Sequence, residues 1–319
     1  MKNRNFYSLF LCAIMVLQLF SCGKNKKFIT RTDTLTSGEA MIAADEGLMP
    51  LINEEIDVFT LLNVDAHIIP VYASEQDIFN YLLTDSIRLI IAARDITDAE
   101  KQQIKNLKRT PRSQKIAVDG IALIIHNENT DSLLSVHDLR KILTGEIQDW
   151  NAISSTKTKE RPITVVFDQQ NSSTLRFMQD SICKEKRFSG NSVAAKSNLE
   201  VLNYVATHPN ALGVIGVNWI SNPKDSTKLS FDNSIRVMSL SKEIYATVEN
   251  SYKPFPAYLA LEYYPLRRDI YAILTDVRGG LPSGFVTFLA GDSGQRIVLK
   301  AGLVPATRPT RLINLQNEF

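Results

Sequence analysis

The sequence predicts an α/β protein. Short apolar runs alternate with amphipathic stretches along most of the 319 residues, which is typical of proteins in which helices cover a sheet. Hydrophobic residues make up 44% of the chain, and the 22% that are charged include both signs, interspersed. We find no internal repeat and no low-complexity block. A chain of this size and composition can bury one or two sizeable cores.

The first part of the pattern predicts alternating strands and helices. The expected elements are a strand at 39–44, a helix at 48–62, a strand at 66–72, a helix at 75–84 and a buried strand at 89–93. Thr97 and Glu100 have the spacing of a capping box, so the next helix should begin after Thr97. Two extended pieces are expected around Lys115 and Ile121.

The rest of the chain continues the alternation. Ser135 should cap a helix that runs to Thr144, with Gly145 as its stop. The further expected elements are a strand at 163–167, a helix at 174–182, a helix at 198–206, a strand at 212–216 and two short helices at 283–290 and 294–300, which end at Gly302 and Pro305. The polar stretches 154–160 and 222–233 are expected to be exposed loops.

The N-terminus predicts export. Lys2 and Arg4 precede an apolar stretch from Phe6 to Phe20, which is too short to span a bilayer and has the build of a secretory signal. Residues 19–22, Leu-Phe-Ser-Cys, resemble the lipobox of bacterial lipoproteins, although Phe20 is bulky for its place. We therefore expect a signal peptide at 1–21, an acylated Cys22 that anchors the protein in a lipid bilayer, and a tether at 22–37.

Cysteine content and charge restrict the classes of protein that remain. If Cys12 leaves with the signal and Cys22 carries lipid, Cys183 is the only remaining thiol, so no intramolecular disulfide is expected. Loss of Lys2 and Arg4 lowers the formal charge of +2 to roughly zero, which argues against nucleic acid as a partner. No later stretch is apolar enough to predict a membrane span.

A hydroxyl-rich turn, Asn171-Ser172-Ser173-Thr174, stands between the strand at 163–167 and the helix that follows it. Strand, turn and helix start is an arrangement in which free backbone N–H groups can hold an anion. The same residues are also the commonest caps of helices that bind nothing. On its own the turn is therefore compatible with an anion-binding loop and with an ordinary helix cap.

Several short motifs, in their order and spacing, resemble the phosphate-binding proteins of bacterial ABC importers, which belong to the type II periplasmic-binding-protein superfamily. Asn171 to Thr174 fall where that family keeps a Gly-Ser-Gly-Thr anion loop. The other matching segments are 117–122 with Asn127 and Asn129, 139–150 with Leu143-Thr144-Gly145 and Trp150, 212–216, 264–267 with Tyr271, and 284–305 with Gly294-Gln295 and Gly302-Leu303-Val304-Pro305. The resemblance covers the chain from about Ser37 onwards.

The resemblance implies two α/β lobes joined by crossing strands, with a hinge between the lobes and a ligand cleft between them. The first lobe should comprise residues 38–118 plus about 262–319, and the second lobe residues 119–261. It also implies a periplasmic, membrane-anchored binding protein, a monomer, that captures inorganic phosphate or a related oxyanion and delivers it to an ABC permease in the inner membrane. A protein of the same fold that senses or adheres through a changed ligand is the alternative.

The resemblance also assigns candidate ligand-binding residues. They lie at strand ends and helix starts and are Asp45, Glu46, Ser74, Arg94, Asp95, Asn171, Ser172, Ser173, Thr174 and Arg176. An arginine can grip an oxyanion through its planar fork. A carboxylate such as Asp45 can accept a hydrogen bond from a protonated phosphate. Alternatively, the acids are favourable charges at a helix start, Ser74 is a helix cap, and Arg94 and Asp95 form a surface ion pair.

One departure from the family bears on the ligand. Relatives have arginine four residues before the first serine of the anion loop, where this chain has Asp168. Either Arg94 or Arg176 replaces the missing charge, or the ligand differs. Micromolar affinity corresponds to about 8 kcal/mol and a hydrogen bond to a charged group contributes roughly 1.5–3 kcal/mol, so four or five donors would suffice without that arginine.

No enzyme motif is found. Serine hydrolysis needs a histidine base held beside its nucleophile, and none of the four histidines, His67, His126, His137 and His208, stands in such a motif. No cluster has metal-ligand spacing. We therefore expect a binding protein with no catalytic residues, no metal and no cofactor.

Overall fold

A computed structural model gives the fold. It describes residues 33–153, 160–188, 191–221, 231–276 and 278–307. The expected signal peptide, Cys22, most of the tether and most of the two polar loops lie outside these residues. Within them, no helix is long and apolar enough to cross a membrane.

The first half of the structure follows the predicted order. The strands are β1 Gly38–Asp45, β2 Ala66–Ala73 and β3 Leu89–Ala92, and the helices are α2 Met49–Leu62, α3 Glu75–Leu83 and α4 Asp98–Asn106. A single 3₁₀ turn, Glu46–Leu48, connects β1 to α2. The capping box of Thr97 and Glu100 is present at the start of α4, as predicted.

The next elements differ from expectation at one point. The two extended pieces form one 14-residue strand, β4 Arg112–Ile125. Its first half pairs with β12 Arg267–Leu274 and its second half with β8 Ala211–Gly216. Because both halves have partners, the strand continues through Asp119-Gly120, a pair that would otherwise favour a break.

The remaining helices and strands complete both halves. They are β5 Leu133–Ser135, α5 Val136–Leu143, β6 Thr164–Phe167, α6 Ser173–Phe177, β7 Ser192–Ala194, α7 Asn198–Thr207, β9 Arg236–Val237, β10 Ser239–Ser241, β11 Ser251–Tyr252, α8 Pro256–Ala260, α9 Leu281–Ala290, α10 Asp292–Lys300 and β13 Val304–Pro305. Ser135 caps α5, and Gly145 follows it with φ of 76°, as expected for a helix stop. The helix expected at 174–182 is divided: α6 is followed by a π-helical turn, Met178–Cys183.

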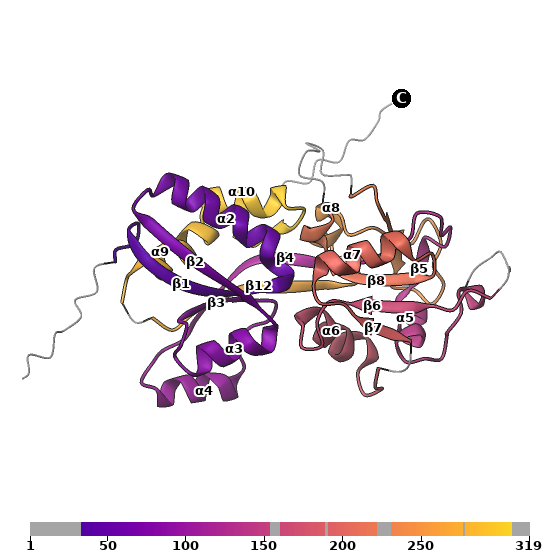
Figure 1. Cartoon of the computed structure of the whole chain (residues 1–319), viewed down its shortest axis with the longest axis horizontal. Helices are drawn as coiled ribbons and strands as arrows, with labels where there is room; N and C mark the ends of the chain where they lie inside the picture. The colour runs from indigo at the N-terminus through magenta and orange to yellow at the C-terminus, as the bar shows by residue number, and fades with distance from the viewer. Residues whose placement is uncertain (1–32, 154–159, 189–190, 222–230, 277, 308–319) are drawn as a thin grey trace, which may run out of the picture. The chain divides into compact units, whose positions relative to one another are not determined.

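The main sheet has the strand order β2-β1-β3-β12-β4-β8-β6-β7, with β9 and β13 as additional partners of β4. β1 is parallel to β2 and β3, while β12 is antiparallel to both β3 and β4. In Figure 1, β4 and β12 run side by side from the part of the molecule that contains β1, β2 and β3 to the part that contains β6, β7 and β8. They are the crossing strands that the fold requires.

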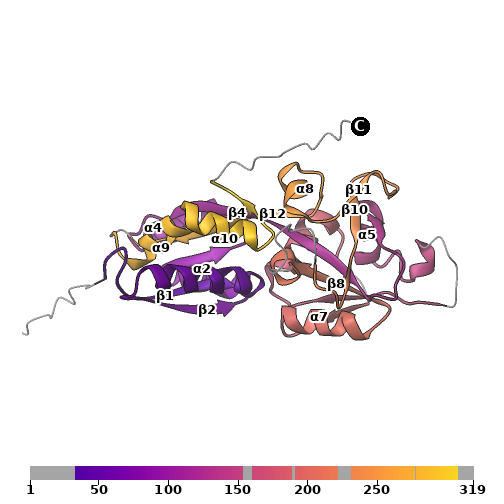
Figure 2. The same cartoon turned by 90° about the horizontal axis from the view of Figure 1, so that it is seen from above.

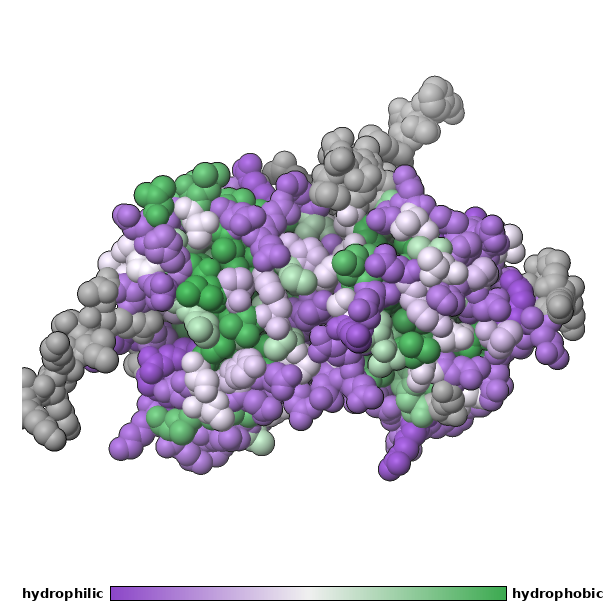
Figure 3. Space-filling model, in the orientation of Figure 1, coloured by the Kyte–Doolittle hydropathy of each residue, from purple (hydrophilic) through white to green (hydrophobic). Residues whose placement is uncertain are grey.

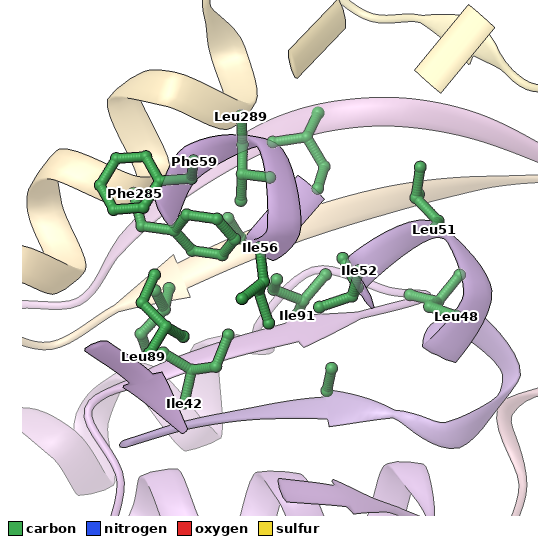
Figure 4. Close-up of a cluster of buried hydrophobic side chains, with 14 of the residues drawn as sticks. Ile42, Leu48, Leu51, Ile52, Ile56, Phe59, Leu89, Ile91, Phe285 and Leu289 are labelled. Carbon is green, nitrogen blue, oxygen red and sulfur yellow. The ribbon is translucent and has the colours of Figure 1, made fainter. Parts of the chain in front are cut away.

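The core of the first lobe lies on both faces of its part of the sheet. Alternate residues of β1 point to opposite faces, so Ile42 and Ala44 pack beneath α2, α9 and α10, whereas Ala43 packs against α3 and α4. Figure 2 shows α2, α9 and α10 together, and Figure 4 shows side chains of α2 and α9 in contact. There the Phe59 ring meets the Phe285 ring edge to face at 5.3 Å.

The second lobe has its own two clusters, also on opposite faces. One packs α5 and the π-helical turn around Trp150, and the other packs α7 against Ile124 and Ile215. Tyr264 and Leu266 also join the first of these clusters, although their segment was assigned to the first lobe. The exact lobe boundaries stay a prediction.

Residues 33–37, expected to belong to a tether, are held against α9. The backbone N–H of Leu281 donates to Asp33 Oδ2 at 3.0 Å. A Cβ at Gly284 would lie 1.7 Å from the Leu35 carbonyl oxygen, so only glycine permits this contact.

Candidate functional site

Nine buried polar residues gather where β1, β4, β6, β8 and β12 come together. This buried polar cluster consists of Asp45, Glu46, Asp119, Asp168, Ser173, Thr174, Asn198, Asn218 and Arg268, each at most 9% exposed. Its members are up to 223 positions apart in the chain, from Asp45 to Arg268. Burial of so many polar groups is costly unless they are paired or bind something.

Arg268 is the only cation of the cluster. It lies at the start of β12, is 5% exposed and donates from Nε to Asp119 Oδ2 at 3.0 Å. Its Nη1 donates to Ser173 Oγ at 2.7 Å. Its Nη2 forms an ion pair with Asp119 Oδ2 at 3.0 Å but donates no hydrogen bond, because the N–H groups do not point at that oxygen. The guanidinium is therefore fixed by β4 and α6 while one amino group stays available.

The predicted serine-threonine turn reaches this cluster. Ser172 caps α6, since its Oγ accepts from the Leu175 N–H at 3.2 Å. Ser173 and Thr174 are fully buried, and Thr174 Oγ1 has no hydrogen-bond partner. The capping interpretation holds for Ser172, whereas Ser173 contacts Arg268 in the polar interior.

Asp45 and Glu46 enter the cluster from the other lobe, at the end of β1. Asp45 Oδ1 accepts from the Gly47 N–H at 2.8 Å. Glu46 accepts from the side-chain amide of Asn198, at the start of α7, and the same amide donates to Asp168 Oδ2 at 3.3 Å. One amide group of Asn198 thus joins carboxylates of both lobes.

A second set of bonds between the lobes converges on one carbonyl. The Gly47 oxygen accepts from Asn218 Nδ2 at 2.9 Å and from the Trp219 indole N–H at 3.0 Å. Gly216 permits this approach, because a Cβ there would lie 3.1 Å from Asn218 Nδ2 and 3.5 Å from the Gly47 oxygen.

Electrostatics in the cluster favour uncharged acids and a charged arginine. Burial raises the pKa of Asp168 to about 7, with a further contribution from the neighbouring Asp45 and Glu46 carboxylates. Burial also raises the pKa of Asp45 and of Glu46. Burial alone would lower the pKa of Arg268, but the Asp119 and Asp45 carboxylates outweigh it and raise that pKa.

Arg94 and Arg176, the two expected replacements for the missing family arginine, are both engaged by acids. Arg94 makes a two-pronged bond to Glu100, at 2.9 and 2.7 Å, and lies 3.5 Å from Glu75. Arg176 pairs with Glu75 from the opposite lobe and donates to the Ala93 carbonyl at 3.3 Å. These two arginines therefore form a charge-balanced network beside the cluster.

Three other predicted residues lie apart from the cluster's hydrogen bonds. Ser74 caps α3 and donates to Asp77 at 2.7 Å. Asp95 is exposed and accepts from the Ile96 N–H at 2.7 Å. Asn171 is exposed and lines a groove.

That groove, of about 480 Å³, lies between α3 and the segment from Gln170 to Gln179. Glu75 and Ser172 are among its lining residues, together with the apolar side chains Phe79, Leu83, Leu175 and Phe188. Ser172 precedes Ser173 in the chain and lies close to Asp168, so the groove lies beside the buried polar cluster.

Sequence reasoning missed Arg268, Asn198 and Asn218, and gave no role to Asp119. Arg268 meets Asp119 across 149 positions and Ser173 across 95 positions, so no local motif links them. The available signal was a charged run, Arg267-Arg268-Asp269, at the start of a strand that is mainly apolar after it; because side chains alternate between the two faces of a strand, at least one of the two arginines must point inward. Within the described residues, no group of His, Cys, Asp or Glu has the arrangement of a metal site.

Comparisons with known proteins agree with this architecture. A family model for a PBP superfamily domain matches residues 30–293. The phosphate-binding protein PstS of Borreliella burgdorferi is 21% identical over 271 residues, which cover 82% of this chain and 88% of that protein. PstS of Bacillus subtilis is 22% identical over 314 residues, which cover 96% and 95% of the two chains.

Solved structures show the same fold. A substrate-binding protein of Clostridium perfringens, described as that of a phosphate ABC transporter and solved with bound phosphate, matches with a TM-score of 0.71, 21% identity, and coverage of 84% of this chain and all of that one. An ABC-type phosphate transport receptor from Vibrio cholerae matches with a TM-score of 0.62, 16% identity and the same coverage. The predicted resemblance and the two-lobed α/β fold are thereby confirmed, and the chain belongs to the PBP superfamily.

Proposed function

We propose that this protein is an extracytoplasmic solute-binding lipoprotein that captures inorganic phosphate or a similar oxyanion between its lobes and delivers it to an ABC importer. The names of its relatives support phosphate as the ligand class. Acylated Cys22, the inner-membrane permease and the periplasmic location belong to the same proposal. In this role the protein binds without catalysing a reaction.

The observation that carries the proposal is the position of Arg268. A buried guanidinium, held by Asp119 and Ser173 and with Nη2 available, supplies the positive charge that the family's usual arginine would supply where this chain has Asp168. Thr174, the residue after Ser173, adds a buried hydroxyl that has no hydrogen-bond partner. An arginine fixed before binding holds an oxyanion with little further loss of side-chain entropy.

Isothermal titration of the purified full-length protein with phosphate and with sulfate tests the proposal. We expect saturable phosphate binding that weakens at least tenfold in the double variant Ser172→Ala/Thr174→Ala, since one hydrogen bond to a charged group contributes about 1.5–3 kcal/mol. A proton on phosphate can be donated to Asp45 or Asp168, whereas sulfate has none to donate. Phosphate should therefore bind more tightly than sulfate.

The matched control is Ser135→Ala. Ser135 is also a buried serine cap in the second lobe, where it accepts from the Asp138 N–H at 3.0 Å. Its loss should lower stability by about 1 kcal/mol, as the loss of a cap does, without changing affinity. Absence of phosphate binding by the wild-type protein would refute the proposal and favour a sensing or adhesion protein with a changed ligand.

A further inference from the structure

The unpaired polar atoms of the buried polar cluster indicate which hydrogen-bonding groups a ligand would need in order to pair with them. Five acceptors have no hydrogen-bond partner: Asp45 Oδ2, Asp119 Oδ1, Asp168 Oδ1, Asn198 Oδ1 and Asn218 Oδ1. The unpaired donors are Arg268 Nη2 and the Thr174 hydroxyl, which can act either way. Acceptors therefore outnumber donors, which is the reverse of what an oxyanion alone requires.

The orientation of the two amides is fixed by their partners. Asn198 Nδ2 must face the carboxylates of Glu46 and Asp168, because only a donor fits between two acceptors. Asn218 Nδ2 likewise donates to the Gly47 carbonyl. The oxygen of each amide is consequently left as an acceptor in the buried interior.

The charges lead to the same conclusion. Asp119 balances Arg268, and Glu46 is hydrogen-bonded by Asn198. Asp45 and Asp168 then share the positive charge of Arg268 with Asp119, because Arg94 and Arg176 pair with Glu75 and Glu100. A dianion bound there would lie beside three buried carboxyl groups that share one cation, which is unfavourable in a medium of low dielectric constant.

We propose that the preferred ligand is a small zwitterion in which an oxyanion group, of the phosphonate or phosphate-ester type, is joined to a protonated amine. Arg268, Ser173 and Thr174 would hold the oxyanion. Asp168, Asp45 and the Asn198 oxygen would accept hydrogen bonds from the ammonium group. The inference rests on the proposed oxyanion-binding function and refines the ligand of that same site.

The groove gives such a ligand room that a bare ion does not use. Its volume of about 480 Å³ is within the range of sites for small organic molecules. Ser172, the neighbour of Ser173 in the chain, is among its lining residues, as are Phe79 and Leu175. In this proposal the carbon chain of the ligand points from the cluster towards the neighbouring groove.

Paired ligands test the proposal on the full-length protein. Calorimetric titrations would compare 2-aminoethylphosphonate with ethylphosphonate, aminomethylphosphonate with methylphosphonate, and all four with inorganic phosphate. We expect each amine to bind at least tenfold more tightly than its amine-free partner. The ratio should fall towards one in Asp168→Asn and in Asp45→Asn, because each replacement removes a carboxylate that faces the ammonium group.

Asp98→Asn is the matched control, since Asp98 is fully exposed on α4, far in the chain from the cluster residues, and pairs with Lys101. It should leave the ratio unchanged. Circular dichroism establishes that each variant is folded. Because two carboxylate variants are tested, the proposal can still be judged if one of them does not fold. If amine-free ligands and phosphate bind as tightly as the amines, the zwitterion proposal is wrong while the oxyanion function stands. If no ligand binds, both are wrong.

Discussion

At the scale of single residues, the pair of Arg268 and Asp119 combines a structural and a binding role. Both side chains are almost fully buried, and each is the other's main counter-charge. Removal of one partner of such a pair leaves an uncompensated buried charge, whereas removal of both can be nearly neutral. Single and double variants of this pair can therefore distinguish an effect on stability from an effect on ligand binding.

We predict that Arg268→Gln lowers the free energy of unfolding by about 3 kcal/mol because it leaves Asp119 unpaired. The double variant Arg268→Gln/Asp119→Asn should recover most of that loss. Both proteins should fail to bind phosphate, since neither has the guanidinium. Urea denaturation and calorimetry measure the two effects, and restored binding in the double variant would exclude Arg268 as a ligand residue.

At the scale of elements, the helices and the first strands were predicted from sequence because their signals are local. Apolar periodicity and caps such as Thr97 and Ser135 lie within the elements themselves. The continuity of β4 was not predictable in this way, because it depends on pairing with β12 and β8. The division of the helix after Phe177 also has no local signal that we recognise.

The buried, apolar face of α2 carries one acidic side chain. Glu55 is fully buried on the face that also includes Ile52 and Phe59, and both of its carboxyl oxygens lack hydrogen-bond partners. Burial raises its pKa to about 9. The folded protein therefore holds a proton on Glu55 that the unfolded chain releases at neutral pH.

This proton makes stability depend on pH. The contribution of Glu55 is fully present below its ordinary pKa of 4.5 and is lost as the pH rises towards 9, because the folded state binds more protons over that range. Glu55→Gln should therefore be more stable than wild type at pH 8 by at least about 1 kcal/mol, and this gain should shrink towards pH 5. Urea denaturation at several pH values checks it. The same gain in Asp57→Asn, on the exposed face of α2, would contradict the role of burial.

At the scale of the whole molecule, the two lobes meet through polar contacts that surround the candidate site. Asn198 joins Glu46 to Asp168, and Arg176 joins Glu75 across the groove. The outer surface, by contrast, carries several apolar areas (Figure 3). Leu61 and Leu62, the last residues of α2, and nearby Val64 are at least 62% exposed. A ligand bound at the candidate site would therefore add its own polar contacts to those that already join the two lobes.

The lobe arrangement gives a prediction about closure. Asn198→Ala removes the amide that joins the carboxylates of the two lobes, so the protein without ligand should populate a more open form. Small-angle X-ray scattering should then show a larger radius of gyration than for wild type. Asn203→Ala, on the exposed side of the same helix, serves as the control. Equal radii for Asn198→Ala and wild type would mean that this contact does not hold the lobes together.

The site was predictable only in part at this scale. Residues near a strand end in one lobe, such as Asp45, and in the turn after β6, such as Ser173, could be named because each lies in a local motif. Arg268 could not, because it reaches Ser173 only after β12 has crossed between the lobes. Arg94 and Arg176 were indistinguishable from it by sequence until the structure showed their acid partners.

The bond from Trp219 to the Gly47 carbonyl has a practical consequence. This indole touches the opposite lobe and is partly accessible to water, whereas Trp150 is completely buried and bonds to Asn210 within its own lobe. Opening of the hinge would expose only the first indole. The emission spectrum of the native protein therefore contains both a reporter and an internal reference, and a single red shift assigned to Trp219 would follow hinge motion without any attached dye.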